Sequence, residues 1–117
     1  MENKSRSRLN GMLGFAMRAG KVITGTELVC SALARQGKGK ALIVLIAKSA
    51  SQGTKDKILH KSEFYGVDAF IIDMDGDELG RLLGKLYAPA VVAITDDRFA
   101  KEIKLALTSC GDSEIQQ

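Results

Sequence analysis

The hydrophobic positions of this chain repeat with two different periods. Between residues 7 and 19 they recur every three or four residues, which predicts an amphipathic helix with one apolar face. That face consists of Leu9, Met12, Leu13, Ala16 and Met17. Ser5 or Ser7 is a candidate N-cap for this helix, and Gly20 follows its last turn, where a left-handed glycine commonly ends a helix.

The segments that follow are either short and continuously apolar or longer and periodic. Short apolar runs predict buried strands at 41–47, 68–72 and 90–95, and a shorter strand at 21–23. Helices are expected at 24–36, 51–65, 76–84 and from Asp96 or Asp97 to Ser109. Helices and strands therefore alternate, which predicts a three-layer α/β/α sandwich with a four-stranded sheet.

Length and composition fit one domain that spans residues 1–117. The chain has 117 residues, of which 45% are hydrophobic and 26% charged, enough for one core without disulfides or metals. No apolar run approaches the roughly 18 residues of a membrane span, and the basic N-terminus lacks the apolar segment of a secretory signal. We therefore expect a cytoplasmic protein with reduced Cys30 and Cys110, and a polar tail at 110–117 that frays.

Charge is distributed unevenly along the chain. Residues 1–61 hold 12 basic and three acidic side chains, whereas residues 62–117 hold five basic and 11 acidic ones, so a formal net charge of +3 conceals halves of +9 and −6. The asymmetry indicates either a basic face for a polyanion or a chance imbalance of solvated surface. In the first case, affinity for nucleic acid would come from counterion release and fall steeply with salt.

Several motifs that would indicate an enzyme or a metal site fail on spacing. No Gly-Lys pair has the upstream glycine of a phosphate-binding P-loop, and 37–40 (Gly-Lys-Gly-Lys) lies between a helix and a strand, in the wrong order for that role. The acidic segment 73–78 fails the EF-hand spacing and fits the start of a helix. His60, the only histidine, has no partners for zinc or for a catalytic triad. We expect no catalysis, metal or cofactor.

A spaced set of motifs is more specific. It consists of 13–29 (LGFAMRAGKVITGTELV), 41–51 with Thr54-Lys55, 78–85 (ELGRLLGK) and 91–96 (VVAITD). Across residues 9–107 the set resembles the ribosomal protein L-seven-Ae / L-thirty-e family of kink-turn RNA binders, in its small bacterial YlxQ-type branch. The resemblance implies a mixed four-stranded sheet and a structured RNA as partner, with ribosomal or other RNA-associated proteins as further partners of a monomer.

The resemblance also implies where RNA would bind. In the family the second helix inserts its first turn into the widened major groove of a kinked RNA, and the matching residues here are Gly25, Thr26, Glu27 and Leu28. Helix N–H groups would meet phosphates there, and polar side chains would contact the base edges that sheared G·A pairs expose. Leu28 cannot form such a hydrogen bond, and Ser31 stands where the family often has lysine. Packing of Leu28 in the core or at its rim remains open.

A second contact is implied for the loop before the last strand, 85–89 (Lys-Leu-Tyr-Ala-Pro), whose candidate contact residues are Lys85, Tyr87, Ala88 and Pro89. Tyr87 can stack on an unpaired base or pack at a helix end, and the sequence leaves both open. The candidate phosphate partners are Arg18, Lys21, Lys48 and Lys85.

Two other classes of function remain. A protein-interaction module would use the same surface and expose an apolar patch around Leu28. A small-ligand enzyme or nucleotide-binding protein would need a pocket with convergent polar groups, and no residue is nominated for one.

Overall fold

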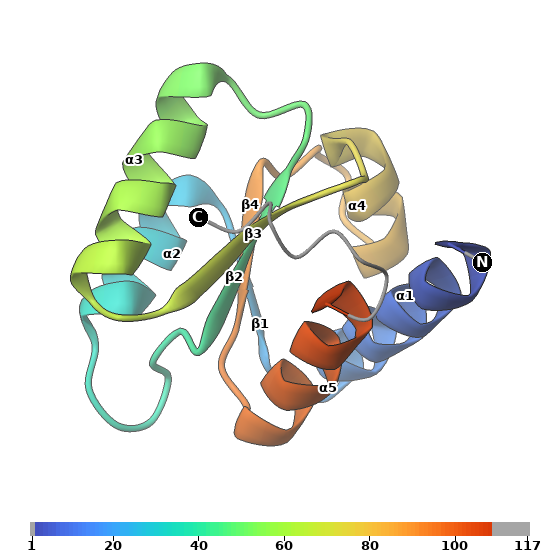
Figure 1. Ribbon diagram of the computed structural model, residues 1–117, viewed down its shortest axis with the longest axis horizontal. Coiled ribbons are helices and arrows are strands. Elements are labelled where there is room, and N and C mark those ends of the chain that lie inside the picture. Colours follow the sequence, from blue (N-terminus) through green and yellow to red (C-terminus); the bar gives the residue numbers. More distant parts are fainter. Residues whose placement is uncertain (1, 109–117) are drawn as a thin grey trace.

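The computed structural model describes residues 2–108, with side chains from Arg8 onward. Helices and strands alternate along the chain as predicted, and they form three layers (Figure 1). The helices are α1 (Glu2–Arg18), α2 (Thr26–Ala34), α3 (Gln52–Phe64), α4 (Gly76–Leu83) and α5 (Asp97–Thr108). The strands are β1 (Val22–Thr24), β2 (Ile43–Ala47), β3 (Asp68–Ile72) and β4 (Val91–Ile94).

The four strands form one mixed sheet in the order β1-β4-β2-β3. Strands β2 and β3 are parallel, with Leu45 opposite Phe70, whereas β4 runs antiparallel to both β1 and β2. Every residue of β2 and β4 is buried, because both strands lie inside the sheet and helices cover both of its faces. The predicted α/β/α sandwich is confirmed.

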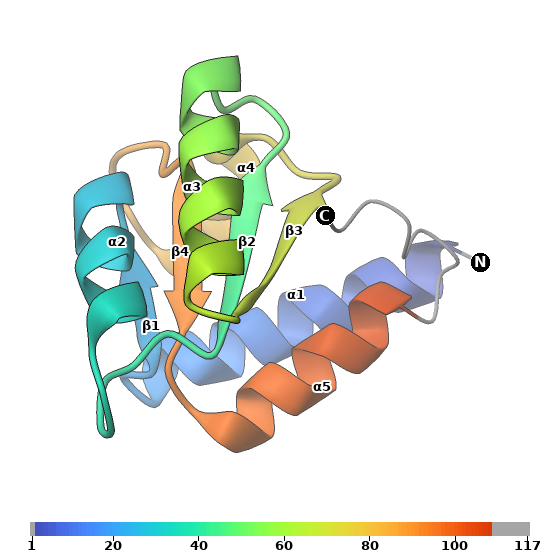
Figure 2. The same ribbon diagram turned by 60° about the vertical axis from the view of Figure 1, so that its left-hand side comes forward.

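Two apolar clusters hold the layers together. Helices α1, α4 and α5 cover one face of the sheet, and α2 and α3 cover the other (Figure 2). Leu13, Leu79 and Ile103 are fully buried in the first cluster, and Leu33 and Ile58 in the second. Each such side chain contributes about 1.5–3 kcal/mol. No helix among residues 2–108 has the length and hydropathy that crossing a bilayer requires.

Several element boundaries differ from the sequence-based expectation, most of all in α1 and α2, and β2 begins at Ile43, two residues later than expected. Helix α1 begins at Glu2, so neither Ser5 nor Ser7 is its N-cap; residues 2–8 contain no large apolar side chain whose periodicity would reveal the extra turns. Thr24 belongs to β1 and is buried, so the second helix begins later, at Thr26. That helix ends at Ala34, before Gln36-Gly37. The expectations for Cys110 and for a frayed tail lie outside the described residues.

The acidic segment 73–78 begins a helix, as one interpretation of the sequence predicted. The Asp75 carboxylate accepts a hydrogen bond from the Glu78 N–H (2.9 Å), and the Glu78 carboxylate accepts one from the Asp75 N–H (3.4 Å). This capping box satisfies amides that α4 would otherwise leave unpaired. Among the described residues, no group of three or more potential ligand side chains has the arrangement of a metal site.

Replacement of Asp75 by alanine should remove the N-cap of α4. Loss of an N-cap carboxylate costs about 0.5–2 kcal/mol, so the free energy of unfolding should fall by that amount in urea denaturation. Asp77→Ala is the matched control, because Asp77 is exposed in the same turn and caps no amide. Equal losses in the two variants would contradict the capping box.

Candidate nucleic-acid interface

The residues expected to bind RNA gather mainly at one edge of the sheet, here called the upper edge. Strands β1, β2 and β3 end there and β4 begins there, at the top of Figure 1. Hydrogen bonds join its loops: the Ala47 N–H donates to the Ala90 carbonyl (2.8 Å), and the Gly76 N–H donates to the Ser49 hydroxyl (2.9 Å). The upper edge is therefore a set of connected loops with fixed relative positions.

Gly25 turns the chain from β1 into α2. Its φ of 104° and ψ of 139° lie where side chains are rarely tolerated, which explains a glycine at this position. Its N–H donates to the Val91 carbonyl (2.9 Å), so the start of α2 is fastened to the start of β4. A Cβ on Gly25 would have nothing within 4 Å, so the backbone here is open to the outside.

No side chain caps the start of α2, in contrast to α3 and α4, which Ser51 and Asp75 cap. The first-turn amides of α2 are therefore available to an anion, and the helix dipole adds a partial positive charge.

The exposed face of α2 carries three of the expected contact residues: Glu27, Leu28 and Ser31. Leu28 is 61% exposed, so the interpretation of this residue as core or rim packing is wrong. Thr26 is half-buried beside Gly25. The first turn of α2 thus presents one carboxylate and one apolar side chain beside uncapped amides.

Tyr87 connects the loop at 85–89 to β1. Its hydroxyl hydrogen-bonds to the Thr24 hydroxyl (2.5 Å), whereas 53% of the side chain is exposed. Thr24 immediately precedes Gly25, so this contact brings Tyr87 beside the start of α2. The tyrosine is therefore held at one end and remains open along its ring, an arrangement suited to stacking.

Two glycines of α4 form a seat for this loop. Gly76 and Gly80 lie one turn apart, and a Cβ on Gly80 would come within 2.4 Å of the Tyr87 carbonyl oxygen. A Cβ on Gly76 would contact Ala88 and Pro89 at 3.1 Å. Pro89 is buried against this seat, so it positions the loop, while Tyr87 and Ala88 are exposed.

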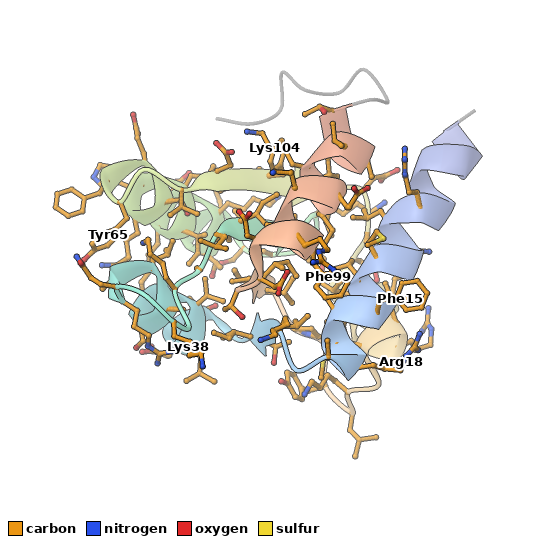
Figure 3. All side chains as sticks on the ribbon, turned by 90° about the horizontal axis from the view of Figure 1, so that it is seen from below. Phe15, Arg18, Lys38, Tyr65, Phe99 and Lys104 are labelled. Carbon is orange, nitrogen blue, oxygen red and sulfur yellow. The ribbon has the colours of Figure 1, made fainter. Side chains whose placement is uncertain are left out.

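The four expected phosphate partners are not brought together. Lys48 lies at the upper edge, where its Nζ contacts the Asp73 carboxylate (3.0 Å), and Lys85 begins the loop that carries Tyr87. Lys21 precedes β1, and its carbonyl accepts a hydrogen bond from the Thr95 N–H at the opposite end of the strand from Gly25, about 13 Å away along an extended chain. Arg18 ends α1, where its guanidinium lies 5.0 Å from the centre of the Phe15 ring (Figure 3).

Sequence reasoning nominated the loop that contains Leu86 but assigned no individual role to three residues that shape this surface. Thr24 anchors Tyr87, Gly80 supports the loop, and the Leu86 side chain is fully exposed at the loop's tip. The four-residue spacing of Gly76 and Gly80 on a helix was a usable signal for close approach of another segment. The sequence did not predict that Leu86 would be exposed, because the exposure of this side chain depends on the direction that the loop takes.

A comparison with protein-family models matches residues 7–104 to the ribosomal protein L7Ae/L30e/S12e/Gadd45 family. The chain belongs to this family. The match includes every strand and all of the upper edge.

Individual relatives agree with this assignment. The chain is 38% identical to the RNA-binding protein YlxQ of Enterococcus faecium over 104 residues, which cover 89% of this chain and 95% of that one. It is 34% identical to the large ribosomal subunit protein eL30 of Sulfolobus acidocaldarius over 100 residues (80% and 93% of the two chains). A solved structure of a Bacillus halodurans protein of unknown function has the same fold, with a TM-score of 0.78, 27% identity and coverage of 86% and 96%.

Gly80→Ala tests the glycine seat. Alanine in mid-helix should stabilise by about 0.5–1 kcal/mol, but here its methyl group would meet the Tyr87 carbonyl, so we expect a net loss of stability and a displaced loop. Gly11→Ala is the matched control, because Gly11 is exposed in α1 with nothing within 4 Å of its Cβ. In thermal unfolding, the Tm of Gly80→Ala should fall below that of the wild-type protein, and the Tm of Gly11→Ala should rise above it. A stabilised Gly80→Ala protein would refute the seat.

Proposed function

We propose that this protein binds a kink-turn-like RNA through the start of α2 and the loop at 85–89. It acts in the cytoplasm in association with the ribosome and has no catalytic activity of its own. One observation carries the proposal: the Gly25–Val91 and Tyr87–Thr24 hydrogen bonds hold the uncapped start of α2 and an exposed aromatic ring at a fixed position relative to each other. Membership of a family that includes proteins named as RNA-binding and ribosomal supports it.

The start of α2 would contact the RNA backbone and the base edges. Its uncapped amides suit a phosphate, since N–H groups and the helix dipole both favour an anion. Glu27 is exposed beside them, and its carboxylate can accept hydrogen bonds from amino groups of bases. Such edges are accessible where a kink widens the major groove, whereas an ordinary A-form helix hides them in a deep, narrow groove.

The loop at 85–89 would contact a nucleotide outside the paired stem. Tyr87 has an exposed ring with its hydroxyl already bonded to Thr24, so stacking would cost little side-chain entropy. Lys48 at the same edge would contact phosphate and contribute to affinity without reading sequence.

A second candidate function is protein binding by the same surface. Leu28 and Leu86 are exposed apolar side chains at the two elements that would contact RNA, and neither can form a hydrogen bond through its side chain. A protein partner would bury both residues and would not need Glu27 or the amides of α2.

Parallel titrations distinguish the two candidates. The probes are a kink-turn RNA, the same RNA with its G·A pairs replaced by Watson–Crick pairs, and a plain duplex, each at two salt concentrations. We expect the kinked RNA to bind at least tenfold more tightly than the other two. Equal affinity for all three would exclude recognition of RNA structure, and no binding at low salt would favour the protein-binding function.

Two substitutions separate reading of bases from attraction to phosphate. Glu27→Ala should weaken binding of the kinked RNA by about 1–3 kcal/mol and leave duplex binding unchanged, because the contact that is lost is to a base edge. Lys48→Ala should weaken binding of all three RNAs alike. It should also reduce the slope of log affinity against log salt concentration by about 1, the value for one phosphate contact. An equal effect of Glu27→Ala on the three RNAs would contradict the proposed role of that residue.

A further inference from the structure

At the opposite end of α2 and α3, five residues form a second surface, here called the aromatic–basic patch: Arg35, Lys38, Lys40, Phe64 and Tyr65. We infer that this patch binds an unpaired strand of RNA that leaves the kinked element held at the upper edge. The inference rests on the proposed function and extends it to a second site. Figure 3 shows Lys38 and Tyr65 on the side of the molecule opposite Phe15 and Arg18.

The aromatic half of the patch offers open ring surface. Phe64, at the C-terminal end of α3, is 78% exposed. The adjacent Tyr65 ring meets it edge to face, with centres 4.9 Å apart, and is itself partly exposed. Two rings fixed against each other form a platform on which a base can stack, whatever its identity.

The basic half of the patch is built onto this platform. The Lys40 Nζ lies 5.6 Å from the centre of the Tyr65 ring and donates to the Leu33 carbonyl (2.6 Å) in the last turn of α2. It therefore ties the ends of α2 and α3 together and offsets the negative end of the α2 dipole, which would otherwise repel phosphate.

The Arg35 side chain lies over Gly39, whose Cβ would be 3.0 Å from the Arg35 Nη1. Gly37 and Gly39 both have positive φ values and turn the loop that carries exposed Lys38. The last residue of this Gly-Lys-Gly-Lys loop, Lys40, lies beside the Tyr65 ring, although the sequence order of the loop excluded a P-loop.

Charge in this part of the chain has one sign. Residues 28–55 contain five Lys or Arg side chains and no Asp or Glu. Glu27 and Asp56 flank this stretch, and Glu63 directly precedes Phe64 in the sequence. Cations can bind the phosphates of a nucleic-acid strand, and the neighbouring aromatic rings can stack on its bases.

The exposed face of α2 connects the two surfaces. Leu28, Ser31 and Arg35 follow one another at helical spacing along this face, from the upper edge to the patch. The helix of nine residues is about 14 Å long, a distance that a few unpaired nucleotides can span. An RNA anchored at Gly25 would therefore deliver its unpaired end to Phe64. An acidic peptide bound at the patch alone would not use the connection to the upper edge along α2. We therefore favour RNA as the ligand.

The test compares three forms of one RNA bound to the full-length chain. The first form is the kink-turn RNA alone. The second carries an unpaired oligouridine extension of about eight nucleotides, made once at each end. The third carries the same extension paired into a duplex. For the wild-type protein, an unpaired extension at one end should raise affinity roughly tenfold, and the duplex extension should not. No gain from either unpaired extension would overturn the inference.

Variants then assign the gain to the patch. Phe64→Leu keeps an apolar side chain but loses the ring, and Lys38→Ala loses one cation; both should abolish most of the gain and leave binding of the unextended RNA unchanged. Phe64→Tyr should retain the gain, and so should the control Leu105→Ala, because Leu105 is similarly exposed on α5, across the sheet. A gain that survives Phe64→Leu would overturn the inference in favour of another partner, such as an acidic peptide.

Free oligouridine at low salt keeps this inference separate from the proposed function. Weak binding that falls several-fold in Phe64→Leu supports the patch even if the kinked RNA does not bind and the proposed function fails. Undetectable or Phe64-independent binding of oligouridine overturns the patch and leaves recognition of the kinked RNA to stand on its own titration.

Discussion

The upper edge of this protein depends on one hydrogen bond, from the Gly25 N–H to the Val91 carbonyl. It extends the antiparallel pairing of β1 and β4 by one position, at the point where the chain must leave the strand and begin a helix. Only a glycine makes that turn without strain at a φ of 104°. The bond fixes the start of α2 relative to β4, and therefore relative to the loop that precedes β4.

The rest of the upper edge reinforces this arrangement from the other side. The loop at 85–89 is held between α4, where Gly80 lets its backbone approach, and β1, where Thr24 binds the Tyr87 hydroxyl. The helix α4 is itself fixed at its start by the Asp75–Glu78 capping box. The exposed groups of the surface thus rest on buried backbone contacts, and their geometry exists before any ligand arrives.

The sequence predicted the fold well because its signals are local. The continuous apolar run of β2 and the helical periodicity of Leu9 and Leu13 depend only on neighbours along the chain, and both predictions were confirmed. The early turns of α1 were missed because residues 2–8 are all polar and leave no hydrophobic periodicity.

The candidate site was predicted in part, for a related reason. A family motif can nominate Gly25 and Tyr87, but the contact of Tyr87 with Thr24 joins residues 63 positions apart, and no local pattern encodes it. The same limit applies to Lys21, which is close to Gly25 in sequence yet lies at the other end of β1. Exposure of Leu28 and Phe64 likewise depends on which helix faces the sheet covers.

The glycine seat on α4 has a consequence for how this surface can change over time. Because Ala88 packs at Gly76, and the Tyr87 carbonyl and Pro89 pack at Gly80, the fully exposed side chain at 86 contributes little to the position of the loop. Selection can therefore exchange the side chain at 86, and with it the chemistry that the loop presents, without changing the scaffold. The absence of a Cβ at Gly76 and Gly80 lets the loop lie close against α4, and the exposed position 86 can vary because the loop is held there.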